Sequence, residues 1–306
     1  MLIVSRVSFG QLQRGNHVSQ ADSSVLPDVQ SRPDPRDLPI DAVGITGIRY
    51  PLTIHTHEAP QRVIATLSMA VGLSETTKGT HMSRFIELLE AQKGPLDQLG
   101  FKALVLEMLK RLEASSGTLQ MWFPYFVRKS APVSGVQSQL DYDVCWRGTV
   151  SDDGRYAFWT HVTVPVTSLC PCSKEISAYG AHNQRSHISI EAELTAEMSP
   201  YELILIAERN ASCEVYGLLK RTDEKYVTER AYENPKFAED LVRDMALALN
   251  QEPRVRAYSI EAQNFESIHN HSAFARIVRP ASAVRPAPSE RRPDRHLHVV
   301  QPGVAV

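Results

Sequence analysis

The order of predicted strands and helices constrains the fold of this chain most, because a similar order occurs in both halves. Strands are predicted where β-branched residues dominate and partly alternate with polar ones, and helices where apolar residues recur every three to four positions. Each half begins with strands, continues with two helices and returns to strand. The predicted segments are 44–56, 61–73, 81–92, 95–114 and 118–127 in the first half, and 139–150, 155–166, 184–194, 199–211, 234–250, 254–265 and 272–279 in the second.

Local signals support several of these boundaries. Ser199 is predicted as an N-cap, with Pro200 in the first helical position and Glu202 three residues after the cap, which makes a capping box. The pair Asn234–Pro235 predicts the start of the next helix in the same way. Gly154 in the sequence SDDG can adopt a positive φ, and it therefore predicts a turn between two strands.

The clearest helix pattern lies in 95–114, where Phe101, Val105, Met108 and Leu112 fall on one stripe. Antiparallel strands with such helices packed on one face form an α+β fold. We therefore predict two units of this kind in one chain, with antiparallel sheets and helices on one face. Sheets of this kind leave exposed edges, which oligomerisation can cover.

Proline-rich polar segments flank the predicted folded body. Four prolines fall just before position 40, and five follow position 279. Such segments bury too little apolar surface to offset the entropy lost on ordering. We expect a flexible N-terminal segment at 1–39, a body at 40–279 with units at about 40–135 and 136–279, and a flexible tail at 280–306.

The overall charge argues against binding of nucleic acid or of an anionic membrane, because the formal net charge of the 306 residues is −2. No apolar run approaches the roughly 20 residues that a membrane span needs. The N-terminus lacks the continuous apolar core of a signal peptide, so we expect a cytoplasmic protein. Four cysteines in such a long chain do not indicate a disulfide framework.

Two cysteines and two histidines lie close together in SLCPCSKEISAYGAHNQRSH, residues 168–187. A disulfide between Cys170 and Cys172 is disfavoured, because it would strain a short ring and form in a reducing compartment. A structural zinc site usually has four protein ligands, and the chain has no second close cysteine pair. An open catalytic metal site needs about three ligands, which Cys170, His182 and a later carboxylate can supply.

A covalent role for a cysteine is an alternative that the residues leave open. A thiolate beside a histidine or a lysine, such as Lys174, is a nucleophile. Cys172 is the available sulfur if Cys170 binds a metal. His187 falls in a predicted strand, where a partly buried polar residue is the simplest interpretation.

A charged segment follows the helix at 199–211. Its simplest interpretation is a solvated turn, and in the alternative Asp223 or Glu224 provides the missing carboxylate ligand. The basic residues in this segment include Lys220 and Arg221.

Two further polar clusters occur. Glu266, His269 and His271 stand between two predicted strands, a composition suited to proton transfer. The segment 75–85 leads into a helix and is either a hydrophilic loop or a site for phosphate oxygens. Its basic residues are Lys78, His81 and Arg84. The sequence contains no Walker or Rossmann glycine pattern, so a nucleotide would be held by other means.

Four long motifs resemble the prokaryotic type IB GTP cyclohydrolase I family. They are PVTSLCPCSKEISAYGAHNQRSH, SCEVYGLLKRTDEKYVTER, NPKFAEDLVRD and NFESIHNHSAFA, and GTHMSRF is also similar. The motifs occur in the family's order. The resemblance extends from about residue 28 to residue 279, so it covers nearly all of the predicted body.

The resemblance implies a tunnelling fold with two strand–strand–helix–helix–strand–strand units per chain. It implies a homotetramer with active sites at subunit interfaces. The implied reaction converts GTP and water into 7,8-dihydroneopterin triphosphate and formate, the first step of folate and pterin biosynthesis. The implied cofactor is a divalent metal, and zinc, manganese and iron all remain open.

The resemblance also implies roles for individual residues. Cys170, His182 and Glu224 are expected to bind the metal. Cys172 matches the second sulfur of the family's Cys-Pro-Cys sequence. The residues expected to hold the purine or move protons are Glu239, Glu266 and His269, and the basic candidates for the triphosphate are Lys78, Arg185, Lys220 and Arg221.

Three other functions remain open at this stage. An archaeal-type cyclohydrolase would release a cyclic phosphate product. A nitrile reductase of the same fold would use a nucleophilic cysteine and NADPH without a metal. A zinc-stabilised binding module would have no catalytic activity, but it would leave the cluster of Glu266 and His269 unexplained.

Overall fold

The structure is a computed structural model and describes residues 27–281; the terminal segments 1–26 and 282–306, most of the predicted flexible regions, lie outside the described residues. The strands are β1 (Ile40–Ile54), β2 (Gln61–Leu73), β3 (Gly117–Ser130), β4 (Gln137–Val150), β5 (Tyr156–Leu169), β6 (Asn183–Leu194), β7 (Cys213–Glu214), β8 (Val255–Asn264) and β9 (Ala273–Arg279). The helices are α1 (Ser83–Ala91), α2 (Gln98–Leu112), α3 (Pro171–Ile176), α4 (Pro200–Arg209), α5 (Arg221–Glu233) and α6 (Ala238–Gln251).

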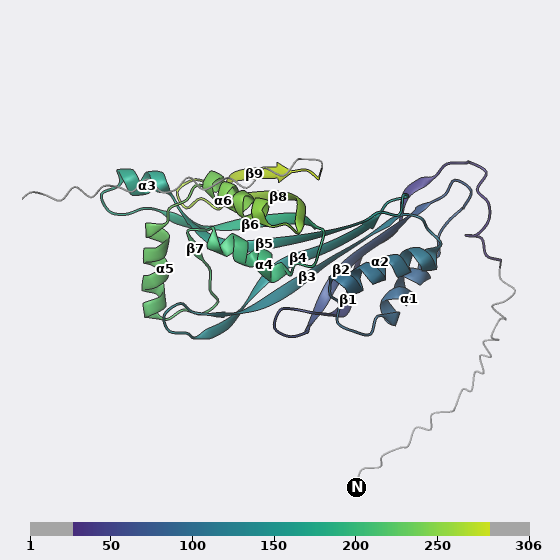
Figure 1. Cartoon of the computed structure of the whole chain (residues 1–306), viewed down its shortest axis with the longest axis horizontal. Helices are drawn as coiled ribbons and strands as arrows, with labels where there is room; N and C mark the ends of the chain where they lie inside the picture. Colours follow the sequence, from purple (N-terminus) through teal and green to yellow (C-terminus); the bar gives the residue numbers. More distant parts are fainter. Residues whose placement is uncertain (1–26, 282–306) are drawn as a thin grey trace, which may run out of the picture.

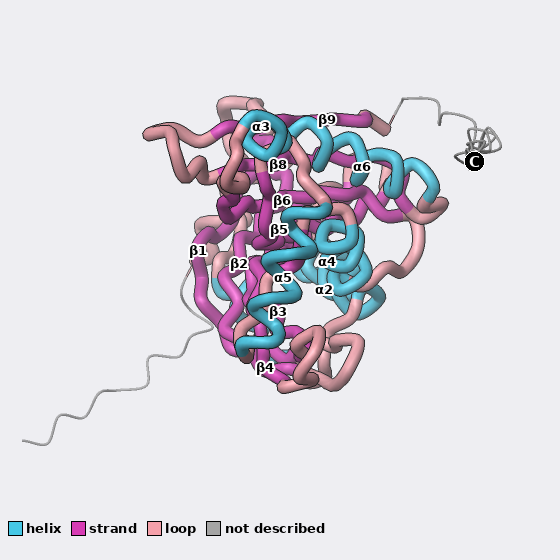
Figure 2. The backbone as a smooth tube through the Cα atoms, turned by 90° about the vertical axis from the view of Figure 1, so that its left-hand side faces the viewer, coloured by secondary structure: helices cyan, strands magenta, loops and turns pink. Residues whose placement is uncertain are grey.

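Both predicted units contribute strands to one continuous sheet. Its strand order is β1-β2-β3-β4-β5-β6-β8-β9, and every neighbouring pair is antiparallel. Figure 2 shows α2, α4 and α6 gathered on one side of the strands. The predicted fold class is therefore confirmed: the protein is α+β, with an antiparallel sheet and helices on one face.

Sheet register places the functional loops at one end. Leu169 pairs with Asn183, and Ser186 pairs with Asn264 on the next strand. The end of β5, the start of β6 and the end of β8 therefore lie at the same end of the sheet, which we call the cysteine end. The end of β2 lies at the other end of the sheet, where Val71 pairs with Gly117.

The predicted apolar stripe of the second helix forms part of the core. Phe101, Val105 and Met108 of α2 are buried, as is Leu112 at its last turn. The helix lies close to the sheet because Gly148 of β4 has no side chain; an added Cβ would lie 2.9 Å from Val105 and 3.2 Å from Phe101. A larger residue at this position would push α2 away from the sheet.

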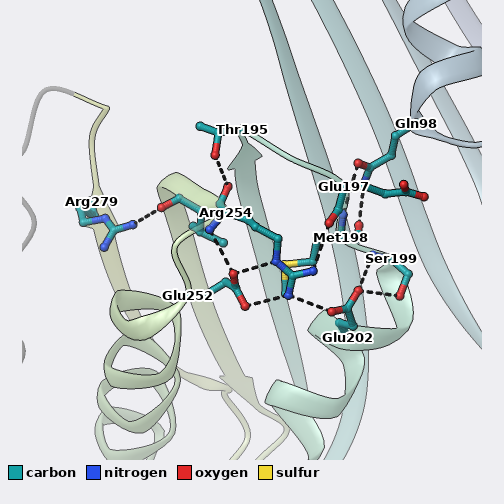
Figure 3. A network of polar contacts seen from close by, with 10 residues as sticks. Gln98, Thr195, Glu197, Met198, Ser199, Glu202, Glu252, Arg254 and Arg279 are labelled. Atoms are coloured by element: carbon teal, nitrogen blue, oxygen red, sulfur yellow. Dashed lines mark hydrogen bonds and ion pairs between the residues drawn. The ribbon is translucent and has the colours of Figure 1, made fainter.

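Polar contacts join the two units on the helical side. Gln98 of α2 donates to the carbonyl oxygen of Met198 at 2.6 Å and accepts from the Met198 amide at 3.3 Å. Beside it, the Arg254 guanidinium donates to both Glu202 and Glu252 at 2.8 Å (Figure 3). These contacts fix the start of α4 relative to α2 and to the strand β8.

The short strand β7 marks a divergence within the sheet. β4 pairs with β5 only as far as Thr163, and β7 takes over that edge of β5 at Val166 and Thr167. Beyond this point the β3–β4 hairpin runs free of β5. The helix α5 spans the resulting gap, and Figure 1 shows it standing between the hairpin tip and α3.

Three local interpretations need correction. The charged segment after α4 is a helix, α5, rather than a turn. Residues 171–176 within the predicted loop form the short helix α3. The last long helix begins at Ala238 rather than directly after Asn234, because Asp240 accepts from the Phe237 amide at 3.0 Å and caps the helix there.

The segment preceding β1 contacts the body. The amides of Lys78 and Gly79 donate to the carbonyl oxygens of Arg32 and Gln30, each at 3.1 Å. The stretch around these residues, assigned from the sequence to the flexible N-terminal segment, therefore packs on the loop before α1. In residues 27–281, no helix is long and apolar enough to cross a membrane.

Candidate active site

Cys170 stands at the end of β5 and caps the short helix α3. Its Sγ accepts from the amide of Ser173 at 3.5 Å, and Pro171 occupies the first helical turn. Cys170 is half-buried and Cys172 is exposed, and neither forms a disulfide. Both thiols are therefore available for chemistry at the cysteine end.

His182 lies directly across the loop from Cys170. The Cys170 amide donates to the His182 carbonyl oxygen at 3.1 Å, and the His182 amide donates to Ser173 Oγ at 3.2 Å. Gly180 makes the return possible, because its φ of 123° is one that residues with a side chain rarely adopt. The loop thus brings together the two residues that the sequence analysis linked as possible ligands.

The imidazole of His182 is held on one side. Its Nδ1 lies 3.1 Å from Gln184 Oε1 and 3.4 Å from Ser267 Oγ. Among residues 27–281, its Nε2 has no hydrogen-bond partner. Such a histidine presents one nitrogen lone pair while the other nitrogen is fixed by the protein, an arrangement typical of metal ligands.

The loop between β8 and β9 reaches the same place. The Phe265 amide donates to the Arg185 carbonyl oxygen at 3.0 Å, and the Phe265 ring packs edge-on against His187 at 4.8 Å. Ser267 of this loop contacts His182, as described above. Glu266 is half-buried, and His269, three residues further along, is exposed. The structure therefore brings the two predicted clusters, 168–187 and 264–273, to one end of the sheet.

Two rings in this loop are stacked on each other. The rings of His269 and His271 are 5.2 Å apart and nearly parallel, with an interplanar angle of 5°.

Of the histidines nearby, His187 has its pKa lowered by burial and, to a smaller extent, by the Arg185 charge. It is therefore neutral at pH 7, which agrees with its interpretation as a partly buried strand residue.

Two other predicted residues flank this end of the sheet. Arg185 is exposed on β6, two residues before His187. Glu239 lies in the first turn of α6, and the approach to that helix is fixed by the Lys236 amide, which donates to the Leu169 carbonyl oxygen at 3.0 Å. Since Leu169 directly precedes Cys170, the start of α6 lies close to the cysteine end.

Glu224 is not brought to Cys170 within this chain. Its neighbour Asp223 accepts from the amides of Val133 and Ser134 at 2.8 Å, which fixes the start of α5 at the β3–β4 hairpin tip. The other end of α5 reaches α3, where Lys174 Nζ donates to the Tyr232 carbonyl oxygen at 2.5 Å. Glu224 precedes Tyr232 by eight positions in the helix, which corresponds to a rise of about 12 Å along its axis.

The basic residues predicted to bind the triphosphate also lie in different parts of the chain. Lys220 and Arg221 lie at the hairpin tip with Glu224, and Lys78 lies at the opposite end of the sheet, in the loop before α1. A cavity of ≈ 540 Å³ adjoins that loop and is lined by His81 and Arg84 among others. Within residues 27–281, no group of three or more His, Cys, Asp or Glu side chains is arranged to hold a metal ion.

The other two cysteines do not compete for the site. Burial raises the pKa of the Cys145 thiol to about 11 and that of Cys213 to about 12, so both are neutral at pH 7. Cys170 and Cys172 are thus the accessible thiols of the chain. A thiolate and a neutral imidazole are good donors for zinc or iron, so Cys170 and His182 fit two positions of a metal site. A metal site with three protein ligands would need its third ligand from elsewhere.

Sequence reasoning did not identify the residues beneath His182. Gln184, Ser168 and Ser186 are polar residues on the buried face of β5 and β6. The signal was present in the sequence, because Gln184 and Ser186 alternate with Arg185 and His187 and therefore share the face of Ile188. Polar residues at core positions of a strand indicate a buried hydrogen-bond network.

The fold and this end site define an α+β enzyme with a thiol–imidazole pair facing a loop that carries a glutamate and histidines. A family model described as type I GTP cyclohydrolase folE2 matches residues 26–275. The chain belongs to this family, which confirms the resemblance at the level of type I GTP cyclohydrolases.

Curated relatives agree with this assignment. The chain is 58% identical to GTP cyclohydrolase FolE2 of Paraburkholderia phymatum, over 83% of this chain and 94% of the relative. It is 57% identical to GTP cyclohydrolase FolE2 of Herminiimonas arsenicoxydans, over 84% of this chain and 98% of the relative. Among solved structures, the uricase of Arthrobacter globiformis aligns with a TM-score of 0.45 at 8% identity, covering 79% of this chain and 95% of that one.

Proposed function

We propose that the chain is a type IB GTP cyclohydrolase I that converts GTP and water into 7,8-dihydroneopterin triphosphate and formate in the cytoplasm. Family membership supports the overall activity. The observation that carries the site assignment is the meeting of the Cys170–His182 loop with the loop bearing Glu266 and His269 at one end of the sheet. These residues are about 100 positions apart and are joined by no local pattern.

The metal in this proposal is a divalent cation, namely zinc, manganese or iron. Cys170 and His182 of one copy would hold it, together with Glu224. A divalent cation at such a site activates water, which allows hydrolysis at C8 of a purine, a poor electrophile. Because Glu224 lies at the far end of α5 from Cys170, we propose that a neighbouring copy in a homotetramer supplies this carboxylate.

The remaining residues of the cysteine end bind the purine and move protons. A carboxylate accepts two parallel hydrogen bonds from the N1–H and the 2-amino group of guanine, and Glu239 or Glu266 is proposed for this role. His269 would donate a proton to the ring nitrogen released from C8, a contribution of about 10²–10⁴-fold. Cys172, exposed beside Cys170, is the further candidate catalytic group.

Binding of the triphosphate requires positively charged side chains, and a single copy does not bring the predicted ones together at the cysteine end. Arg185 is the predicted basic residue that lies here. Lys220 and Arg221 share the start of α5 with Glu224, so a copy that supplies Glu224 would present them as well. Lys78 would reach the site only from another copy, because it lies at the opposite end of the sheet.

A product assay tests the proposal. Purified protein is stripped of metal, reloaded separately with zinc, manganese or iron, and incubated with GTP. Formate release together with a pterin that becomes fluorescent on oxidation is the expected result. Mass spectrometry separates the linear triphosphate from a cyclic phosphate, and NADPH consumption with a deazapurine nitrile would indicate the reductase instead. No formate with any of the metals would overturn the proposal.

A further inference from the structure

A buried chain of hydrogen bonds runs from His182 into the sheet. Gln184 Oε1 lies 3.1 Å from His182 Nδ1, and Gln184 Nε2 donates to Ser168 Oγ at 2.8 Å. Ser168 Oγ lies 2.7 Å from Ser186 Oγ, which donates to Asn264 Oδ1 at 2.8 Å. The chain thus crosses from β6 to β5, back to β6, and on to β8.

The members of this chain are shielded from water. Gln184 and Asn264 are 8% and 4% exposed, and Ser168 and Ser186 are fully buried. An unpaired polar group in such a place costs about 1–3 kcal/mol, so each member is held to its partners. Such a network keeps one arrangement rather than exchanging freely with solvent.

The chain has a single direction of donation. Its last member, Asn264 Oδ1, is a carbonyl oxygen and can only accept, so Ser186 donates to it. Ser186 then accepts from Ser168, and Ser168 accepts from the Gln184 amide nitrogen. This leaves the Gln184 oxygen facing His182, and only a protonated Nδ1 can donate to it. The neutral imidazole is therefore held with its proton on Nδ1 and its lone pair on Nε2.

The same chain is connected to the opposing loop. Asn264 is the last residue of β8, and the loop carrying Glu266 and His269 begins directly after it. Ser267 of that loop also contacts His182 Nδ1, at 3.4 Å. One buried network thus sets both the orientation of the His182 imidazole and the start of the loop that carries Glu266 and His269.

We propose that Gln184 is a positioning residue that fixes the tautomer and orientation of His182, with Ser168, Ser186 and Asn264 holding Gln184 in place. This inference rests on the proposed function in one respect, the metal that His182 Nε2 would bind. Glutamine suits the role because its side chain accepts at one atom and donates at the other. Partners of this kind typically change metal affinity by about 10–100-fold when they are removed.

The experiment uses the full chain and two readouts. Gln184→Met keeps the length of the side chain but removes both polar atoms, and Ser168→Ala removes the next member of the chain. Gln184→Glu retains an acceptor for Nδ1–H and serves as the conservative rescue. Thr160→Val is the matched control, because Thr160 lies on the buried face of β5 like Ser168 but its hydroxyl has no hydrogen-bond partner among the described residues.

The first readout is the tautomer in metal-free protein. Solid-state NMR of ¹⁵N-histidine-labelled protein distinguishes protonated from bare ring nitrogens, and the His182 signals are those missing from His182→Gln. We expect protonated Nδ1 in the wild type, in Gln184→Glu and in Thr160→Val, and mixed tautomers in Gln184→Met. Ser168→Ala should show a smaller shift in the same direction.

The second readout is the affinity for Zn²⁺ alone, measured by competition with a chelator. Gln184→Met should bind about 10–100-fold more weakly than wild type, and Thr160→Val should bind equally well. Wild-type tautomers in both Gln184→Met and Ser168→Ala would overturn the inference, as would an affinity loss with no change of tautomer. Ser168→Ala decides the matter if Gln184→Met does not fold. A wild-type protein that releases no formate from GTP with zinc, manganese or iron would refute the proposed function instead, since the tautomer is measured without metal.

Discussion

The amide of Cys170 donates to the carbonyl oxygen of His182 at 3.1 Å, although 12 positions separate the two residues in the sequence (182 − 170). This backbone contact places the half-buried Cys170 opposite His182, whose Nε2 has no hydrogen-bond partner within residues 27–281. In the proposed function, each of these two side chains would contribute one bond to the same cation.

Removing the thiol should therefore abolish metal binding. Cys170→Ala is expected to purify with little metal and to lose GTP turnover, because a site with one protein ligand from this loop holds a divalent cation weakly. Elemental analysis and formate release provide the measurements. Cys145→Ala is the control, since its thiol is buried and neutral, and it should retain metal. Full metal content in Cys170→Ala would exclude this residue as a ligand.

Glu224 provides a test of sharing between copies. Cys170→Ala and Glu224→Gln should each be inactive alone, because each removes one proposed ligand. When the two are co-expressed, a mixed assembly contains sites with Cys170 from one copy and Glu224 from the other, and partial GTP turnover should return. If both ligands came from the same chain, the mixture would contain no intact site and would remain inactive.

His269 should affect the chemistry rather than the binding. His269→Ala is expected to retain metal and GTP affinity while formate release slows by about 10²–10⁴-fold, the range for a positioned acid. Single-turnover formate release and equilibrium GTP binding separate the two effects. The neighbouring ring supplies a control: His271→Ala removes the stacking partner but not the proposed donor, and its loss of rate should be smaller. An unchanged rate in His269→Ala would remove it from the mechanism.

Chelation should inactivate the protein without unfolding it. The main hydrophobic core extends across both units and includes neither Cys170 nor His182. Stripping the metal is therefore expected to abolish turnover while leaving the far-ultraviolet circular dichroism and a cooperative thermal transition. Adding back zinc, manganese or iron, whichever supports turnover in the untreated protein, should restore activity. Unfolding on chelation would indicate the zinc-stabilised binding module that the sequence left open.

A buried ion pair should matter for stability. Lys129 Nζ lies 2.6 Å from Glu208 Oε1, the two side chains are 11% and 9% exposed, and Tyr142 also donates to Glu208. Lys129→Ala leaves the carboxylate without its cation and should cost about 3–5 kcal/mol of unfolding free energy. Lys225→Ala breaks an exposed pair and should change it by about 0.5 kcal/mol or less. Chemical denaturation compares the two variants.

Much of the fold could be predicted from local patterns. β2 has the predicted bounds, and the α2 stripe is buried. The capping box at Ser199 is present, with the Ser199 amide donating to Glu202 at 2.8 Å. These features depend on neighbours in the sequence, so periodicity and capping residues are sufficient to find them.

The helix α5 had no such signal. Of its residues only Asp223 and Ala231 are buried, so it has no apolar stripe for periodicity to detect. Its start is fixed by contacts with Val133 and Ser134, about 90 positions away in the sequence. The late start of α6 has partly the same origin, because the Lys236 amide donates to Leu169 in addition to the local cap that Asp240 forms. Contacts of this range are set by tertiary structure and override local preference.

The candidate site likewise combines features that the local sequence predicts with features that depend on tertiary structure. The pairing of Cys170 with His182 is a loop property and could be anticipated from spacing. The meeting of that loop with Glu266 and His269 depends on β6 lying between β5 and β8, which is a matter of strand order. The place of Glu224 depends on the direction of α5, and no pattern in the sequence gives that direction.

Within the described part of the chain, the main path of the sheet has eight strands, and every step along it reverses direction. An even number means that the two outermost strands, β1 and β9, point in opposite senses. A second copy laid edge to edge, with its β1 beside this chain's β9, would continue the alternation without a parallel seam. A chain with one strand fewer would break that parity and place two parallel strands at such a seam, whereas adding or losing a hairpin would preserve it.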